Sequence, residues 1–214
     1  MLFCFFAMIL VAEACNMKSE SQKSAPMVEV TEVSSVVNET RWDLVPDRSI
    51  VTWRGFKPGG GHHGTITPIS GYMLMLDGEP QAGAIEVNME SLTVDDLEGE
   101  MMYKLENHLK GPDFFDMSKY PTAMFEVTSI KTSDSDQYPY LVRGNMAIKD
   151  SIRSIEFLGR CYEVGDTLYV ESDSFKIDRT EFGVNYKSKN IFKELKDNFI
   201  NDDMELKVNA KFVK

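Results

Sequence analysis

Three histidines, His62, His63 and His108, are the residues with the clearest capacity for metal chemistry in this sequence. A catalytic zinc site needs about three protein side chains around the ion, and imidazoles are common among them. Neighbouring residues in an extended chain point in opposite directions, so His62 and His63 are poorly placed to reach one ion. No Asp or Glu lies at a helical i+3 or i+4 spacing that would complete the set. The pattern therefore predicts packing or surface histidines and no metal site, while a metal enzyme would need His62 or His63 to approach His108 beside a carboxylate.

The sequence contains no arrangement that suggests a nucleophile with its base. The Gly-x-Ser-x-Gly turn that exposes a nucleophilic serine is absent. Cys161 alternates in phase with Ile155 and Phe157, which predicts a small buried hydrophobic side chain and not a reactive thiol. Asp178 and Arg179 are expected to form an ion pair at a strand end, with contact to a ligand headgroup as the alternative. These patterns predict a protein that is not an enzyme and that carries no cofactor.

A glycine-rich segment, KPGGGHHG at residues 57–64, is predicted to be a flexible loop. A phosphate-binding loop would end in Gly-Lys-Ser/Thr and open a helix, and neither feature follows. The formal net charge of −11 also argues against a nucleic-acid partner, because an acidic surface repels phosphate groups. The same net charge disfavours attraction to anionic lipid headgroups.

The N-terminus is expected to direct export. Residues 1–14, MLFCFFAMILVAEA, contain an apolar run that is too short to span a bilayer but suits an export signal. Ala14 directly precedes Cys15, which suggests cleavage of a bacterial prolipoprotein and acylation of Cys15; more than one acyl chain gives stable membrane attachment. Residues 15–40 are then a lipidated, flexible tether, and residues 41–214 are the folded domain in the periplasm or cell envelope. A plain secretory signal is the alternative.

Alternation of apolar and polar residues with a period of two predicts most of the elements. The predicted strands are 50–56, 65–76, 82–89, 123–128, 141–149, 151–164, 168–177 and 205–213. The dipeptides Asp77-Gly78 and Gly165-Asp166 are typical of tight hairpin turns. Strands without alternating helices indicate an antiparallel sheet. About eight such strands can close on themselves and leave room for a slender ligand.

One main helix is predicted over residues 91–110, because apolar side chains recur there at helical spacing. Its apolar face is formed by Leu97, Met101, Leu105 and Leu109. Gly111 and Pro112 end this helix, and a pair of phenylalanines follows. We name residues 105–116 the lid, since a helix end and an aromatic turn are expected to close one end of the sheet. A short second helix is predicted over residues 190–198.

The lid also carries a family resemblance. The segment HLKGPDFFDMSKYPTAMFEV, residues 108–127, resembles the signature segment of the YceI-like family, which are periplasmic, lipocalin-like β-barrels that bind polyisoprenoid lipids. The resemblance continues in order through residues 64–66, 83–89, 143–149 and 178–184. It covers roughly residues 41–214 and implies a mainly β, antiparallel, lipocalin-like barrel. Residues 59–63 and 186–203 depart from the family pattern. If residues 186–203 covered the barrel mouth, the length or identity of the ligand could differ from that of the family.

We predict a protein that encloses a poorly water-soluble ligand. This prediction combines the export signal, a set of strands sufficient for a barrel, and the apolar lid. The resemblance implies an isoprenoid lipid, such as a quinone or polyprenyl compound, and each buried methylene contributes roughly 0.8 kcal/mol. The predicted lining residues are Trp53, Leu109, Phe114, Phe115, Phe125, Val127, Phe157, Phe182 and Phe212. Each of them has plain barrel core as its alternative. The alternative function is a filled barrel that serves as a surface or stress-related interaction module, and a homodimer is left open.

Overall fold

The computed structural model describes residues 38–214, which form an antiparallel β-barrel with one α-helix. The ten strands in this part of the chain are β1 (Glu39–Leu44), β2 (Ile50–Lys57), β3 (Gly60–Leu76), β4 (Glu79–Asn88), β5 (Thr122–Thr132), β6 (Tyr140–Ile148), β7 (Ser151–Val164), β8 (Thr167–Ser172), β9 (Phe175–Asp178) and β10 (Asp203–Val213). The helices are α1 (Gly99–Lys110) and the short 3-10 turns η1 (Pro46–Arg48), η2 (Met89–Ser91), η3 (Arg179–Phe182) and η4 (Lys193–Leu195). The predicted mainly β, antiparallel fold is confirmed.

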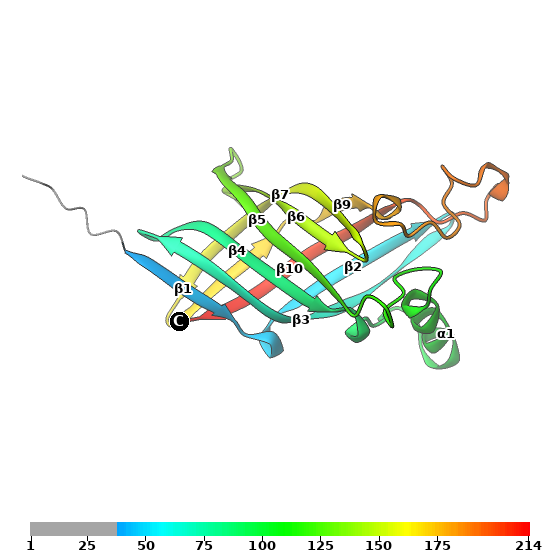
Figure 1. Ribbon diagram of the computed structural model, residues 1–214, viewed down its shortest axis with the longest axis horizontal. Coiled ribbons are helices and arrows are strands. Elements are labelled where there is room, and N and C mark those ends of the chain that lie inside the picture. Colours follow the sequence, from blue (N-terminus) through cyan, green and yellow to red (C-terminus); the bar gives the residue numbers. More distant parts are fainter. Residues whose placement is uncertain (1–37) are drawn as a thin grey trace, which may run out of the picture. The chain divides into compact units, whose positions relative to one another are not determined.

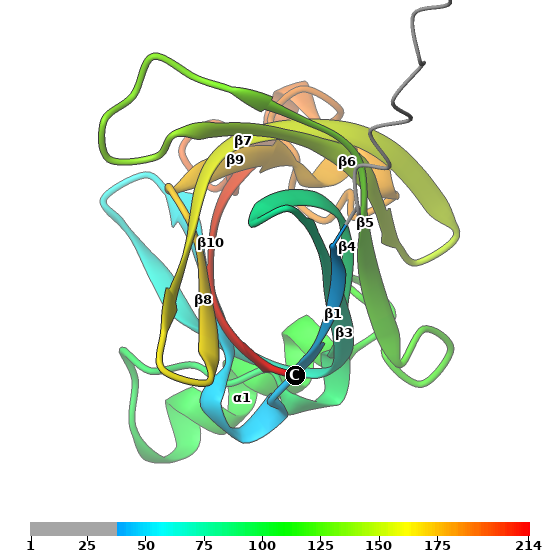
Figure 2. The ribbon, with the colours of Figure 1, turned by 90° about the vertical axis from the view of Figure 1, so that its left-hand side faces the viewer.

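The ten strands occupy eight positions around the ring, in agreement with the predicted number of about eight. One edge of β10 pairs with β9 and then β8, and its other edge pairs with β2 and then β1. Both β1 and β2 also pair with β3. Each of these two strand pairs therefore shares one position, while β3 to β7 and β10 take one position each. Figure 2 shows the closed ring of strands from one end of the barrel.

Both predicted hairpin turns are confirmed. Asp77 and Gly78 join β3 to β4 with φ angles of 51° and 87°, and two-residue hairpin turns of this kind require positive φ. Gly165 has a φ of 60° between β7 and β8. The strands on either side of each turn pair directly, so these dipeptides set the register of their hairpins.

Most of the glycine-rich segment is part of a strand, so the predicted loop is wrong except for a two-residue turn at Pro58 and Gly59. Residues 60–64 begin β3 and pair with β2. A Cβ atom on Gly61 would overlap the carbonyl oxygen of Gly55, and one on Gly64 would overlap the carbonyl oxygen of Thr93. Glycine is needed here because two backbones approach closely, not because the chain must be flexible.

Helix α1 begins at Gly99 and not at residue 91. Gly99 has a φ of 58°, a left-handed conformation that interrupts a right-handed helix. The residues before it run extended beside β3, where the N–H groups of Thr93 and Asp95 each donate to a β3 carbonyl oxygen at 2.9 Å. The prediction missed this start because the backbone hydrogen bonds that hold residues 93–95 beside β3 leave no signal in apolar spacing.

The buried face of α1 differs from the predicted one by one residue. Met102, Leu105 and Leu109 pack against the core, whereas Met101 is 61% exposed. Residues seven positions apart lie almost in line on a helix, so Met102 shares the face of Leu105 and Leu109, whereas a strict i+4 series drifts around the helix and carries Met101 off that face. The helix ends at Lys110, with Gly111 as its C-cap, as predicted. Figure 1 shows α1 at one end of the barrel, where the lid closes it.

The long connection before β10 contains the 3-10 turns η3 and η4, and residues 190–198 form no α-helix, so the predicted second helix is wrong. Its base is held by Arg179, which is 4% exposed. The guanidinium donates to the carbonyl oxygens of Val184 at 2.6 Å, Asn201 at 3.0 Å and Ile200 at 3.1 Å. One buried cation thus joins the two ends of the connection, around residues 184 and 200–201.

The predicted ion pair between Asp178 and Arg179 is also wrong. Asp178 accepts hydrogen bonds from the N–H and hydroxyl of Thr180, at 2.8 and 2.6 Å, and caps η3. Arg179 pairs instead with Oδ1 of Asp202 at 3.4 Å. Burial lowers the pKa of the Arg179 guanidinium, and the charges of Asp202 and Asp178 oppose that shift. A charge this deep is held by its partners.

Two separate apolar clusters form the core. The larger one lies beneath the lid and includes Trp53 and Phe182. The smaller one gathers Trp42, Leu168 and Phe212 from β1, β8 and β10. Each cluster joins strands that are distant in sequence, so the clusters help to hold the ring closed.

Strand β1 is not among the predicted strands, and it begins within the segment expected to be a tether. Its partners on β3 and β10 are hydrogen-bonded in register. The expected export signal, the acylated Cys15 and most of the tether fall outside residues 38–214 and stay predictions. Within residues 38–214, no helix is long and apolar enough to cross a membrane.

Candidate functional site

An apolar cavity of about 150 Å³ runs inside the barrel. The strands β2 to β10 all contribute to its wall, and Phe115 of the lid closes one end. Four of the predicted lining residues lie there, namely Phe115, Phe125, Val127 and Phe157. The cavity therefore connects the lid with the interior of the strands.

The wall formed by β5, β6 and β7 is only partly packed: Ala123 and Met146 contact the larger apolar cluster, whereas Phe125, Val127 and Phe157 belong to neither cluster. On β5, Ala123, Phe125 and Val127 point inward and alternate with exposed neighbours, yet these three side chains stay half-exposed. The inward residues Met146 and Phe157 of β6 and β7 are half-exposed in the same way. Apolar side chains that face inward and still keep accessible surface are lining a space that could admit another apolar molecule.

An aromatic row narrows this cavity. The ring of Phe125 lies 5.2 Å from that of Phe157, and Phe157 stacks on Phe175 with a centroid distance of 4.4 Å. Gly144 provides the space for Phe125, because a Cβ atom at that position would overlap the phenylalanine ring. Phe175 also packs against the larger apolar cluster, whereas Phe125 and Phe157 belong to neither cluster, so rotation of the Phe157 side chain can open the row.

A second cavity of about 90 Å³ lies under the lid. Trp53, Leu109, Phe114 and Phe115 line it, which places four of the predicted residues there. Phe115 and Met204 are the two residues that line both cavities. They form a partition between the two spaces, and Phe115 belongs to both sets.

Aromatic contacts fix the lid. The His108 ring meets Phe114 edge-on at 4.9 Å and Tyr186 at 4.6 Å. The Phe114 and Tyr186 rings are 5.3 Å apart. Nε2 of His108 lies 3.6 Å from Oδ2 of Asp113. The histidine is thus a packing residue of the lid.

The end of the main cavity away from the lid carries polar groups. The hydroxyl of Tyr140 donates to Oε2 of Glu79 at 3.0 Å. Burial, followed by this hydrogen bond, raises the pKa of Tyr140 to about 12. Burial also raises the pKa of the Cys161 thiol to about 11, with the negative charges of Glu79 and Glu163 adding to the effect. Arg160 donates to Glu171 at 2.6 Å, and both line the cavity. The Tyr140 hydroxyl and the Cys161 thiol are therefore the groups that this end presents to a ligand, because the Arg160 guanidinium is already paired with Glu171.

The two remaining predicted lining residues, Phe182 and Phe212, line neither cavity. Phe182 is 1% exposed in the cluster beneath the lid, and Phe212 is completely buried in the smaller cluster. Both follow the alternative reading as barrel core. Phe212 was predicted from its strand phase and Phe182 from the 178–184 motif, but core side chains surround both rings.

Several lining residues were not among the predicted ones. The main examples are Ala123, Tyr140, Val142, Met146, Arg160, Glu171 and Phe175. The signal was present on β6, where Tyr140, Val142 and Met146 continue one alternating face. The alternating pattern did not point to Arg160 and Glu171, because a charged pair is not expected to line an apolar cavity.

The histidines of β3 lie apart, as the sequence suggests. Nδ1 of His62 is 2.9 Å from Oδ2 of Asp96, and the side chain lines the lid cavity. His63 lines a different surface depression. Within the described part of the chain, no three His, Cys, Asp or Glu side chains gather as metal ligands would.

Comparison with known proteins places this geometry in a family. A family model described as a YceI-like domain matches residues 42–212. A UPF0312 protein of Azotobacter vinelandii is 26% identical over 98 residues, or 46% of this chain; the match spans 48% of that relative, about half its length.

Two solved structures share the fold. The crystal structure of Burkholderia cenocepacia BcnA has a TM-score of 0.63 at 19% identity, covering 79% of this chain and 99% of that one. A polyisoprenoid binding domain from Saccharophagus degradans, implicated in plant cell wall breakdown, has a TM-score of 0.57 at 8% identity, covering 80% and 97%. These likenesses show the lipocalin-like barrel, and because the family model spans most of the sequence, the chain belongs to the YceI-like family.

Proposed function

We propose that this protein binds an isoprenoid lipid, a quinone or a polyprenyl compound, inside the barrel and performs no chemistry on it. The observation that carries the proposal is the wall of β5 to β7, whose inward apolar side chains are half-exposed to an empty space. Covering that wall with an apolar chain removes its surface from water, which is the dominant source of affinity for such ligands. The fold similarity to a polyisoprenoid binding domain supports the same ligand class.

The size of the cavity implies that its wall must move. A void of about 150 Å³ accommodates roughly one benzene ring, so a chain of several isoprene units needs more room. The Phe157–Phe175 stack and the Phe115–Met204 partition are the two places where side-chain rotation would lengthen the space. We therefore expect the bound form to differ from the empty form at these four side chains.

The first experiment is organic extraction of the full-length protein purified from its native host, followed by mass spectrometry. A stoichiometric isoprenoid supports the proposal and identifies the ligand. A protein that is empty, and that also fails to take up added quinones or polyprenols, contradicts it.

A matched pair of variants tests the location. Val127→Trp places a large ring in the main cavity, and Thr128→Trp places the same ring on the outer face of the same strand. Uptake of an added quinone should fall at least tenfold in Val127→Trp and stay within about twofold in Thr128→Trp. Equal uptake by the two variants would place the ligand elsewhere.

The alternative, a filled barrel acting as an interaction module, is favoured by one observation. The Phe125, Phe157 and Phe175 rings already contact one another inside the barrel. In a filled barrel these contacts persist, and no added lipid would change the fluorescence or the NMR signals of the ring protons. The extraction experiment separates the two functions.

The cellular setting is a further part of the proposal. The protein would be exported and held at the cell envelope by an acylated Cys15, as the Ala14-Cys15 junction after an apolar run suggests. Substituting Cys15→Ser should release the protein from the membrane fraction and remove the acyl mass from its N-terminus. Unchanged fractionation and mass would exclude the anchor.

A further inference from the structure

A cationic loop with an apolar tip extends from the lid end of the protein. We name residues 187–198 the basic loop; they contain four lysines and two carboxylates, giving a formal charge of +2 in a chain of net charge −11. At the tip, Ile191 is 49% exposed and Phe192 is 39% exposed. Figure 1 shows this loop projecting beyond the strand ends, at the same end as α1. Large apolar side chains next to lysines are thus presented to the outside.

The positive charges of the basic loop are not neutralised by the protein. Within residues 38–214, none of its lysines forms an ion pair. Lys187 donates to the amide oxygen of Asn198 at 3.0 Å, and the Lys189 ammonium lies 4.8 Å from the centre of the Phe199 ring. Lys193 and Lys196 are exposed. These ammonium groups are available to anions outside the protein.

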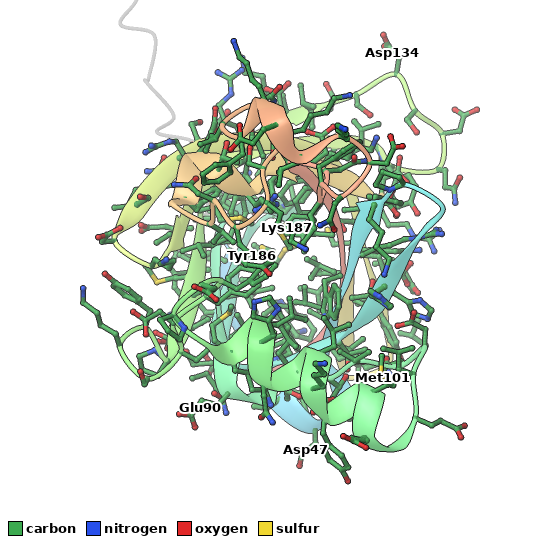
Figure 3. The ribbon with its side chains drawn as sticks, turned by 90° about the vertical axis from the view of Figure 1, so that its right-hand side faces the viewer. Asp47, Glu90, Met101, Asp134, Tyr186 and Lys187 are labelled. Atoms are coloured by element: carbon green, nitrogen blue, oxygen red, sulfur yellow. The ribbon has the colours of Figure 1, made fainter. Side chains whose placement is uncertain are left out.

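The base of the loop is fixed to the barrel and to the lid. Ser188 is fully buried, and its carbonyl oxygen accepts from the N–H of Phe192 at 2.9 Å. Just after the loop, the N–H of Asn201 donates to the carbonyl oxygen of Phe56 on β2 at 2.9 Å, and just before it, the Tyr186 ring lies 4.6 Å from the His108 ring of the lid. Figure 3 looks at this end and shows Tyr186 and Lys187 between the loop and helix α1. The tip is therefore held out from a fixed base beside the lid.

We propose that the basic loop docks on the surface of an anionic lipid bilayer. Ile191 and Phe192 would enter the boundary between headgroups and acyl chains, and the lysines would lie beside the lipid phosphates. Apolar insertion combined with basic residues is the pattern of interfacial membrane binding. The acidic remainder of the barrel does not prevent docking, because charges more than about 8–10 Å from the surface are largely screened at physiological ionic strength.

This inference goes beyond lipid binding in the cavity and stands without it, since the loop would dock whether or not the barrel is loaded. If the cavity does bind an isoprenoid, docking would bring the lid to the membrane in which such lipids dissolve.

The test uses tryptophan as a reporter in the full-length protein. Phe192→Trp places the reporter at the loop tip, and Val164→Trp places it at an apolar position, 59% exposed, at the end of β7 next to the β7–β8 turn. Each variant is mixed with vesicles of phosphatidylglycerol and phosphatidylcholine that carry brominated acyl chains, and the signal of the unsubstituted protein is subtracted. An N-terminal anchor would hold both variants at the vesicle equally, so their difference reports on the loop.

We expect a blue shift and at least twofold quenching for Trp at position 192, and neither change at position 164. Replacing Lys189, Lys193 and Lys196 by Gln in the Phe192→Trp protein should weaken this response about tenfold or more. Replacing the exposed Lys131 and Lys176 in the same way should leave it unchanged. Any of three results would overturn the proposal: no quenching at position 192, equal quenching at both positions, or burial of the Trp at position 192 by protein dimerisation in the absence of vesicles.

Discussion

Strands β10 and β5 show the same alternation in sequence but have different surroundings inside the barrel. Near the end of β10, the inward side chains of Ala210 and Phe212 are buried and line neither cavity, whereas Leu206 of the same strand borders the main cavity. On β5, Phe125 and Val127 face inward and are half-exposed. Alternation therefore identifies the face that a side chain takes, but not whether other atoms fill the space in front of it. The packed β10 side stabilises the ring, and the hollow β5 side is available for a ligand.

The largest expected effect tests the packed side. Phe212→Ala removes a ring that is 0% exposed, and we expect the free energy of unfolding to fall by about 3–5 kcal/mol. Chemical denaturation followed by circular dichroism measures the change. Ile152→Ala, at a 63% exposed position on β7, is the control and should change stability by less than about 0.5 kcal/mol. A loss below about 1 kcal/mol for Phe212→Ala would show that this side is not tightly packed.

The second expected effect concerns the partition between the cavities. Phe115→Ala joins the two spaces, and because the ring borders voids on both sides, we expect a loss of about 2–3 kcal/mol, less than at position 212. The longest prenyl chain that binds tightly should increase in this variant. A chain-length series measured by calorimetry checks this. If the wild type binds such chains and Phe115→Ala shows the same length preference, the partition does not limit the ligand.

The third effect tests the hollow side directly. Phe157→Ala removes a half-exposed ring, so the free energy of unfolding should fall by only about 1–2 kcal/mol. The same substitution widens the cavity, and the protein should then take up bulkier apolar molecules. Losses of equal size for Phe157→Ala and Phe212→Ala would contradict the distinction between the two sides.

The smallest effect is a pH dependence on the hollow side. The pKa of Cys161 is raised from 9.0 to about 11, and that of Tyr140 from 10.0 to about 12. The folded protein binds these protons more tightly than the unfolded chain, so their stabilising effect is complete below pH 9 and is lost as pH rises toward 12. Denaturation midpoints should decline over this range, and less so in a Cys161→Ala/Tyr140→Phe double variant. An identical decline in the double variant would assign the loss to other groups.

The fold was largely predictable because period-two alternation and hairpin dipeptides are local signals. Asp77-Gly78 set its turn correctly since the required φ angles depend on those two residues alone. Gly61 and Gly64 misled, because glycine in a sequence does not distinguish a flexible loop from a strand that another backbone approaches. The start of α1 was predicted wrongly for a related reason: residues 93 and 95 are hydrogen-bonded to β3, and apolar spacing does not reveal such backbone contacts.

The candidate site was predictable only in part. Phe125, Val127 and Phe157 follow from strand phase, but the same phase selected Phe212, whose surroundings are filled by Trp42 and Leu168. That distinction depends on which distant strands meet, and no local pattern contains it. The contribution of Arg179 was missed for the same reason, since its acceptors lie on a connection that has no periodicity.

The pairing of β10 has a consequence for the way the protein folds. Four strands, β1, β2, β8 and β9, hydrogen-bond to β10, which is the last of the ten strands to be synthesised. A nascent chain that ends before residue 203 can form the β3-to-β8 meander, but it keeps open edges that can pair with other chains. Closure then joins residues that are more than 150 positions apart, as between β2 and β10, and such long-range contacts make folding slow. The unpaired strand edges therefore stay exposed to aggregation until β10 joins the sheet. A chain truncated within β10 would keep these edges exposed permanently.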